Sequence, residues 1–422
     1  MSSYTFDSFL EEGEQPMFDI EGEKKRLLDH MEDLKKMGVE ESTFWKKWVE
    51  VQEYKSIVAK TNAVKAKIWR PTDIMDVEKT VEEIQNLKPR IFYVDPSPPQ
   101  RVNPINGKME DDPIAIRRNE TLMEDWLMLR IFCHTMAYDQ TPGRFLRFLV
   151  IDDVSEQYLG AVSLSNDVMA LTCRDNFIGW THKNRCDDGM LIHSAIGSCI
   201  MGTQPFGYNF LGGKLVASLI LSKYVRDTWE RVVGKKLVGM TTTSLYGPNS
   251  MYCGIPYWQG CGTSMGKISL KPDDRFYDIW HARIKETRAE EYARKIDKVD
   301  PSKGPITGIK QRILDMIFRE VGTSSSKYHH GFERGVYYAP FYEETKSFLS
   351  RQIEGEPEKW TLIKRFETDA DGMIAWWKPK AIKRYRKLHA ENRVKSDILF
   401  YNKMIGKDYD EAKSLFLGDV GR

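Results

Sequence analysis

The chain is poor in cysteine, and none of its cysteines forms a C-x-x-C motif. Structural zinc sites use closely spaced cysteine or histidine pairs, and small secreted domains carry dense disulfide frameworks. The spacing here fits neither, so we assign no residue to a metal and expect reduced thiols. This predicts a cytoplasmic protein. The 422 residues contain six cysteines: Cys133, Cys173, Cys186, Cys199, Cys253 and Cys261.

A long apolar run and a phosphate-binding P-loop are also missing. A helix needs ~20 apolar residues in a row to cross a bilayer. The nearest candidate, residues 202–221, is interrupted by Gln204, Asn209 and Lys214. The first residues show no basic segment followed by an apolar core, so we expect no signal peptide. The absence of G-x-x-x-x-G-K-[ST] argues against nucleotide hydrolysis by a P-loop, and we expect no membrane partner.

Charge is nearly balanced overall but unevenly distributed. The chain has 63 Lys and Arg against 61 Asp and Glu. Its first 23 residues carry seven carboxylates and no Lys or Arg, whereas residues 376–395 carry eight Lys or Arg and one carboxylate. A basic run interleaved with aromatic residues is typical of contact with DNA phosphates, although a solvated helical face is the alternative. We predict that DNA contacts are made by Lys383, Arg384, Arg386 and Lys387.

Hydrophobic periodicity predicts an α+β core with helical extensions on both sides. We expect residues 1–20 to be a disordered acidic tail and residues 21–88 to be helical. In residues 89–272 a strand, a helix, a two-stranded hairpin, a strand, a helix and two further strands follow one another. The hairpin is expected at residues 144–151 and 158–165, and one continuous helix at residues 210–233. Residues 273–422 form a helical, basic C-terminal region.

Four short blocks in a fixed order carry a more specific signal. The blocks are Leu159-Gly160-Ala161 with Ser163, Ile178-Gly179-Trp180 with Arg185, Leu211-Gly212-Gly213-Lys214-Leu215, and Trp258 with Gly262, Ser264 and Gly266. Together they resemble the family of the Druantia anti-phage protein DruA, over roughly residues 145–270. Through that family the chain resembles the phage Mom DNA-modification protein and the GNAT acyltransferases. The resemblance implies a GNAT-like, Mom-like mixed sheet in the core and, if a phage encodes the chain, a place in the host cell cytoplasm.

The resemblance also implies a site at one end of that sheet. The hydroxyl-rich strand before the last block offers Thr241 and Thr243 as hydrogen-bond partners on one side. We expect Arg185 to grip a phosphate or a carboxylate, and Tyr257 or Trp258 to stack on a base. A core anchor is the alternative for Trp258. The family carries an acidic residue in this strand, whereas the strand here has none.

The loop that enters the core helix is close to the Q-x-x-G-x-[GA] loop, which holds the coenzyme A pyrophosphate in GNAT enzymes. Asn209 replaces its last small residue. Free amide groups at a helix N-terminus favour phosphate. We therefore predict an acyl-coenzyme A site, with an ordinary glycine-containing turn as the alternative. The expected contact residues are Gln204, Gly207, Asn209, Gly212, Gly213 and Lys214.

Two functions remain open at this point. The leading hypothesis is a DNA-acting enzyme that transfers an acyl-type group to a nucleobase in phage or mobile-element biology. The alternative is a non-catalytic DNA-binding or defence subunit that has kept the fold. The missing acidic residue favours the alternative, whereas the phosphate-loop-like turn favours the enzyme.

Overall fold

The structure is a computed structural model that describes residues 19–54, 63–97, 100–104, 107–138, 144–244, 251–297, 309–396, 404 and 406–420. The chain divides into two compact units. Unit 1 comprises residues 1–38 and 268–330, and unit 2 comprises residues 39–267 and 331–422. Residues 1–18 of the predicted acidic tail lie outside the described residues. The domain boundaries expected from the sequence stay predictions.

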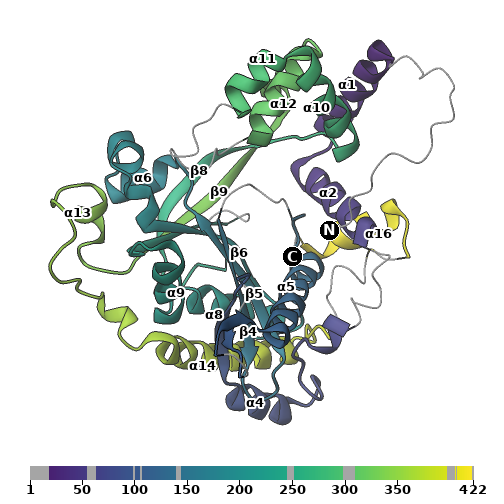
Figure 1. The fold of residues 1–422 in the computed structure, drawn as a ribbon. Coiled ribbons are helices and arrows are strands. Elements are labelled where there is room, and N and C mark those ends of the chain that lie inside the picture. The colour runs from purple at the N-terminus through teal and green to yellow at the C-terminus, as the bar shows by residue number, and fades with distance from the viewer. Residues whose placement is uncertain are drawn as a thin grey trace. The chain divides into compact units, whose positions relative to one another are not determined.

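A seven-stranded mixed sheet, in the order β1-β4-β5-β6-β7-β9-β8, lies at the centre of unit 2 (Figure 1). Most of the described pairings are antiparallel, and β6 and β7 are parallel. The predicted mixed α+β fold and the predicted hairpin are therefore confirmed. The strands are β1 (Pro89–Val94), β4 (Phe145–Asp152), β5 (Tyr158–Asn166), β6 (Ser194–Gly202), β7 (Gly239–Ser244), β8 (Gln259–Ser269) and β9 (His329–Pro340).

Helices pack on both faces of this sheet, because alternate residues of its strands are apolar on each side. In β4, Phe148 and Val150 face one core cluster and Leu149 faces the other. The first cluster contains residues of α4 (Val77–Asn86), α8 (Gly212–Leu219), α9 (Lys223–Val233) and α14 (Asp369–Ala390). The second contains residues of α2 (Val39–Tyr54), α5 (Pro113–Cys133) and α16 (Tyr409–Val420).

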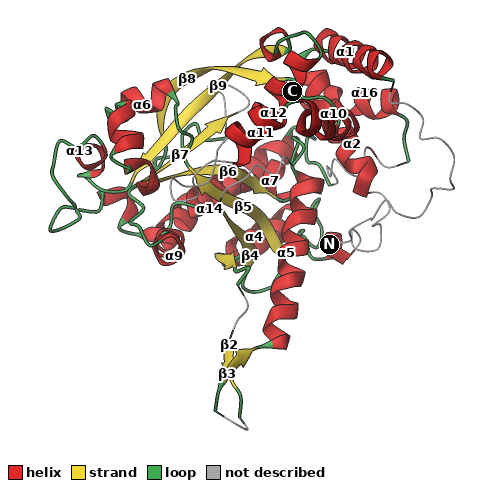
Figure 2. Cartoon of the chain, turned by 45° about the horizontal axis from the view of Figure 1, so that its top comes forward, coloured by secondary structure: helices red, strands yellow, loops and turns green. Residues whose placement is uncertain are grey.

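Shorter elements complete unit 2. Two short strands form a hairpin that projects from the rest of the unit beside the first turn of α5 (Figure 2). The shorter elements are β2 (Gln100–Val102), β3 (Met109–Asp111), α6 (Thr172–Ile178), α7 (Phe206–Asn209) and α13 (Thr345–Leu349).

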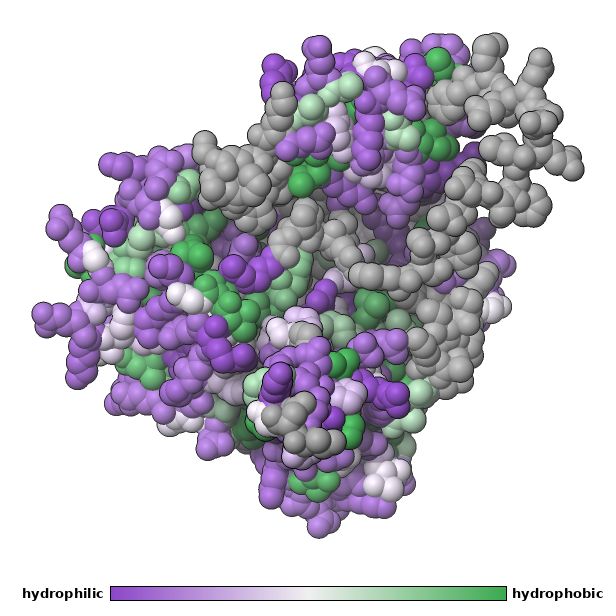
Figure 3. Space-filling view, in the orientation of Figure 1, coloured by the Kyte–Doolittle hydropathy of each residue, from purple (hydrophilic) through white to green (hydrophobic). Residues whose placement is uncertain are grey.

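The surface is mainly polar on the face seen in Figure 3, where hydrophilic residues cover most of the area and small hydrophobic patches lie between them. Within the described residues no helix is both long and apolar enough to cross a membrane.

Unit 1 is helical and buries its own apolar residues. Its second segment leaves the sheet after β8 and returns as β9. Buried apolar side chains come from three of its helices, for example Met31, Trp280 and Ile317. The helices are α1 (Ile20–Lys36), α10 (Asp274–Thr287), α11 (Ala289–Tyr292) and α12 (Ile309–Glu320).

Two expectations about single elements were wrong. The continuous helix predicted at residues 210–233 is broken into α8 and α9, because Ser222 has extended backbone (φ −64°, ψ 160°) and caps a new helix. The strand β9 was not expected in the C-terminal region, yet its residues 335–340 pair with all of β7, from Gly239–Pro340 to Ser244–Gly335. The sheet therefore takes a strand from beyond the range in which the sequence placed it.

Candidate functional site

A fully buried carboxylate lies directly after β5. The Oδ1 of Asp167 accepts hydrogen bonds from the Arg174 guanidinium at 2.5 Å and from the Val168 amide at 2.8 Å. Its Oδ2 accepts from the hydroxyls of Ser194 and Thr241, each at 2.6 Å. None of its side-chain surface is exposed. Four donors, one of them charged, fix this carboxylate in place.

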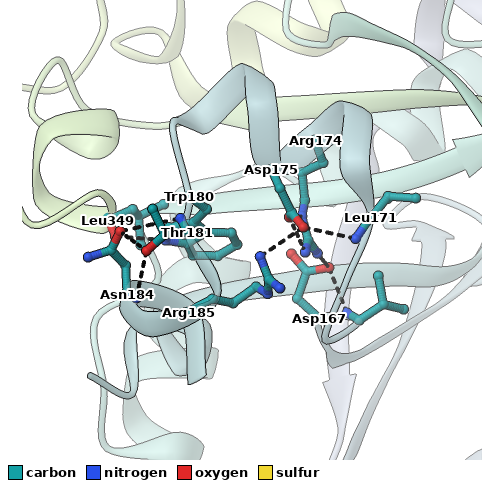
Figure 4. A network of polar contacts seen from close by, with 10 residues as sticks. Asp167, Leu171, Arg174, Asp175, Trp180, Thr181, Asn184, Arg185 and Leu349 are labelled. Carbon is teal, nitrogen blue, oxygen red and sulfur yellow. Dashed lines mark hydrogen bonds and ion pairs between the residues drawn. The ribbon is translucent and has the colours of Figure 1, made fainter. Parts of the chain in front are cut away.

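One arginine ties Asp167 to a second buried carboxylate (Figure 4). Arg174, on α6, donates from Nε and Nη2 to Oδ1 of Asp175, at 2.9 and 2.6 Å. Burial alone lowers the pKa of Arg174, but the neighbouring carboxylates of Asp167 and then Asp175 outweigh it, so this pKa is raised. The guanidinium also lies 5.1 Å from the ring of Trp180. Arg174 therefore holds α6 against the end of β5.

Arg185 is the last member of this network. Its Nη1 donates to Oδ2 of Asp175 at 2.8 Å, and 7% of its side chain is exposed. Its Nε is buried without a partner. Nε and Nη2 form the planar edge with which arginine holds a carboxylate or a phosphate. In Arg174 that edge is filled by Asp175, whereas in Arg185 no described residue fills it.

The Ile178-Gly179-Trp180 block explains why α6 ends where it does. Gly179 is left-handed (φ 86°), a conformation that glycine adopts without steric cost, and it closes the helix. The amides of Gly179 and Trp180 both donate to the carbonyl of Asp175, at 2.9 and 2.8 Å. The Trp180 indole then donates to the carbonyl of Leu349 at 2.7 Å. The block thus positions the two arginines and their shared carboxylate.

The strand β7 distributes its hydroxyls to opposite faces of the sheet, as the period of two predicts. Thr241 donates to Asp167, whereas Thr242 donates to the Gly197 carbonyl at 3.2 Å and to the Tyr252 hydroxyl at 3.1 Å. Thr243 is half-buried and shares the face of Thr241. The structure therefore brings Thr241 into the network of Arg185.

The two aromatic residues expected beside Arg185 lie on the other face, with Thr242. The Trp258 indole donates to the carbonyl of Ala217 in α8 at 2.7 Å, and its ring packs against Tyr252. Tyr257 is 5% exposed and packs in the same core cluster. The structure thus separates both residues from Arg185. The packing fits the core-anchor alternative for Trp258, and base stacking stays a prediction.

The predicted coenzyme A loop is closed by its own hydrogen bonds. The amides of Gly207 and Asn209 donate to backbone carbonyls of the loop, at 2.6 and 3.1 Å. The amide of Tyr208 donates to the side chain of Gln204 at 3.1 Å. These three amides are therefore not available to a pyrophosphate in this conformation.

The same loop is fastened to the segment after α14. The Asn209 side chain is fully buried. It donates to the backbone carbonyl of Lys395 at 2.6 Å and accepts from the amide of Lys395 at 3.1 Å. Asn209 therefore joins two segments that are distant in the sequence.

Glycines at the start of α8 allow the helix to approach the sheet closely. A Cβ on Gly202 would lie 2.9 Å from backbone atoms of Gly212 and Gly213, and a Cβ on Gly212 would lie 2.2 Å from the Phe206 ring. Close backbone approach accounts for these small residues without a ligand.

Lys214 donates to the carbonyl of Cys253, and burial lowers the pKa of Lys214.

The predicted DNA-contact residues lie on α14. Lys383, Arg386 and Lys387 are exposed, whereas Arg384 is half-buried with its Cζ 5.3 Å from the ring centre of Tyr208. The Nζ of Lys395 lies 5.0 Å from the same ring. The basic helix and the Gln204–Asn209 loop thus meet at Tyr208.

Sequence reasoning missed Asp167. A carboxylate directly after a predicted strand was a visible signal, but no pattern in the sequence says which other strand end lies beside it. The fold places Asp167 against Thr241, so a carboxylate from the end of β5 lies beside β7, which has none of its own. Among the described residues no group of three or more His, Cys, Asp or Glu could hold a metal ion.

The family model described as "Druantia protein DruA" matches residues 112–351. The chain belongs to this family. The matched region contains the whole buried network and ends before α14. A curated relative, Druantia protein DruA of Escherichia coli (strain UMEA 4076-1), is 26% identical over 308 residues, 68% of this chain and 70% of the relative. No solved structure matches this chain, and the likeness of the DruA family to Mom and GNAT proteins stays a prediction.

Proposed function

We propose that this chain is a DNA-binding protein of anti-phage defence, and that it contacts DNA phosphates through the exposed basic face of α14. The observation that carries the proposal is the separation of faces on this helix. One face buries Met373, Trp377, Ala381, Tyr385 and Leu388 in the core of unit 2. The opposite face carries cations in a chain whose charge is otherwise balanced. The defence role rests on membership of the DruA family.

The carboxylates near Arg386 and Lys387 do not prevent these two cations from binding a phosphate. Arg386 lies 3.6 Å from Glu78, and Lys387 lies 3.7 Å from Glu391. All four side chains are more than a third exposed. Exposed ion pairs of this kind contribute only ~0–1 kcal/mol each and are screened by salt. Phosphates of a DNA backbone, with their release of counterions, can replace them.

The basic face continues from α14 onto the neighbouring loop. Arg384 and Lys395 both lie against Tyr208, and Asn209 fixes the backbone of Lys395. Cations held over a ring lose less conformational freedom when they bind a phosphate. This arrangement supports a binding surface formed by α14 together with the Gln204–Asn209 loop.

A charge-reversal variant tests the proposal. We expect Lys383→Glu, Arg386→Glu and Lys387→Glu together to weaken DNA binding for any sequence, because the lost contacts are to the backbone. The slope of log affinity against log salt should fall in magnitude by ~3, about one for each lost phosphate contact. Fluorescence anisotropy with two unrelated duplexes over a salt series measures both quantities.

The matched control makes the same change in net charge elsewhere. Lys25, Lys35 and Lys36 are exposed on α1, and their replacement by Glu should leave the affinity and the salt slope nearly unchanged. The proposal is wrong if the α14 variant binds like the wild type at low salt. It is also wrong if both variants lose affinity equally, since net charge alone would then be the cause.

The short pairing between β6 and β7 at the centre of the sheet favours a second candidate function, transfer of an acyl-type group to a base. The parallel register of β6 and β7 covers only Ser194–Gly197 with Gly239–Thr242, although both strands continue. A sheet that opens between parallel strands suits a ligand site, and the open edge of Arg185 suits an anion. The Gln204–Asn209 loop does not fit a pyrophosphate as it is folded. Calorimetry with coenzyme A and its acyl esters, and mass spectrometry of DNA from cells expressing the chain, decide this candidate.

A further inference from the structure

Four arginines are buried in the part of the chain that the structure describes: Arg130, Arg174, Arg185 and Arg226. The guanidinium of Arg130 donates to two backbone carbonyls, at 2.7 and 3.2 Å. Those of Arg174 and Arg185 are paired with carboxylates. Arg226, on α9, is 4% exposed, and its guanidinium makes no hydrogen bond or ion pair with a described residue. It alone among the four lacks an acceptor.

Aromatic rings are the closest neighbours of this guanidinium. The Cζ of Arg226 lies 5.1 Å from the ring centre of Phe341 and 5.9 Å from that of Phe366. Ring faces attract a cation. They do not replace the hydrogen bond that the Nε of Arg226 loses on leaving water, because this atom is buried without a partner. The site thus has donors and a cation but no acceptor.

A second donor without a partner lies one helical turn earlier. Ser222 caps α9, is fully buried, and its hydroxyl makes no hydrogen bond. Residues four apart share a helix face, and helical side chains lean toward the N-terminus. Ser222 and Arg226 therefore lie on the same side of the first turn of α9. The helix dipole favours a negative charge at this end of the 11-residue helix.

An oxyanion already lies at this helix end. The carboxylate of Asp369, the first residue of α14, accepts from the amide of Lys223 at 2.6 Å. Asp369 forms no ion pair with Arg226, whose Nε has no partner, so the cation is left for another acceptor. In the first turn of α9 the Lys223 amide therefore has an acceptor within the protein, whereas the Ser222 hydroxyl and the Arg226 guanidinium have none among the described residues.

We propose that Ser222 and Arg226 form a binding site for an oxyanion, a phosphate or a carboxylate carried by a ligand, at the first turn of α9. The guanidinium supplies the charge and a planar pair of donors, and the serine hydroxyl supplies a third hydrogen bond. Phe341 and Phe366 form an apolar wall beside the anion. The site shares no residue with the Arg185 network or with the basic face of α14.

Thermal denaturation of the full chain in chloride, acetate and inorganic phosphate, at equal ionic strength, tests the site. We expect phosphate or acetate to raise the melting temperature of unit 2, which contains the site, in a saturable way above that in chloride, by about 5 °C at saturation. Arg226→Met should show no such rise. A rise with phosphate alone identifies a phosphoryl ligand, and a rise with acetate alone identifies a carboxylate ligand.

The melting temperature in chloride separates ligand binding from a structural role. Removing an unpaired buried charge in favour of a methionine of similar size is neutral or stabilising. Arg226→Met should therefore melt at or above the wild-type temperature in chloride, and below it in the binding anion. A purely structural arginine predicts a lower melting temperature in every buffer.

Two controls and two outcomes complete the test. Arg231→Met removes a cation from the same helix at a side chain that is 59% exposed, and it should keep the wild-type response. The α14 charge-reversal variant should also keep the wild-type rise in melting temperature, although α14 itself attracts phosphate. The proposal is overturned if neither anion raises the wild-type melting temperature above that in chloride. It is equally overturned if Arg226→Met responds as the wild type does.

Discussion

At the scale of single residues, the buried charge of Asp167 is expected to contribute strongly to stability. Replacing it with Asn keeps the shape but removes the charge that faces Arg174, and all of the side chain is buried. Breaking one partner of a buried ion pair costs ~3–5 kcal/mol. We expect Asp167→Asn to lower the free energy of unfolding of unit 2 by about this amount, measured by urea denaturation followed by circular dichroism.

An exposed ion pair provides the matched control. Asp153 accepts from Arg90 at 2.6 Å with 42% of its side chain exposed. Asp153→Asn should cost no more than ~1 kcal/mol, because water replaces the lost contact. Equal losses for the two variants would mean that burial of the network does not determine its contribution.

A buried lysine gives the protein a pH-dependent stability. Lys47 on α2 has no exposed surface. It donates to Glu50 at 2.6 Å and to the carbonyl of Ile131, near the end of α5. Burial, opposed by Glu50, lowers the pKa of Lys47 from 10.5 to about 8. The unfolded chain therefore binds more protons than the folded one between these two values, and the free energy of unfolding rises with pH there.

The variant Lys47→Met isolates this effect. The difference in unfolding free energy between wild type and variant should move in favour of the wild type by ~1–3 kcal/mol from pH 8 to pH 10.5. Urea denaturation at half-unit pH steps measures it. Lys35→Met, at an exposed position on α1, should show a flat difference. A flat difference for Lys47→Met as well would show that burial does not perturb this amine.

At the scale of elements, local periodicity predicted most strands well but not where they lie in the sheet. The alternation that puts Thr241 and Thr242 on opposite faces follows from the strand alone. The break between α8 and α9 was not visible because residues 220–222 are compatible with a helix, and only the tertiary context extends Ser222. The strand β9 was missed because its aromatic residues have no turn signal that pairs them with β7.

In the candidate site, too, local patterns predicted some of the residues but not the face of the sheet on which each one lies. Arg185 and Thr241 were predicted together, whereas the residues that join them, Asp167 after β5 and Arg174 and Asp175 on α6, were not predicted as a link. Tyr257 and Trp258 were expected beside them because sequence spacing gives no information about the face of the sheet. Which face a residue takes depends on long-range pairing and on the packing of α8, and neither is encoded in a local pattern.

At the scale of the whole molecule, the helices of unit 1 interrupt a connection between two neighbouring strands. The segment between β8 and β9 carries α10, α11 and α12, yet these two strands are adjacent in the sheet. Neighbouring antiparallel strands need only a short turn to connect them. Unit 1 also buries apolar residues of its own, such as Leu27, Trp280 and Leu314. The sheet of unit 2 therefore does not need these helices in order to form.

We therefore expect two thermal transitions in the full chain, one for each unit. A trimmed protein that starts at Val39 and replaces residues 271–327 with a short glycine-containing turn should show one transition, the one assigned to unit 2. It should also keep the DNA affinity of the full chain, because α14 belongs to unit 2. Differential scanning calorimetry and fluorescence anisotropy make these measurements. A trimmed protein without a cooperative transition would mean that unit 2 depends on unit 1, and a folded one that no longer binds DNA would move the DNA-binding surface from α14 to unit 1.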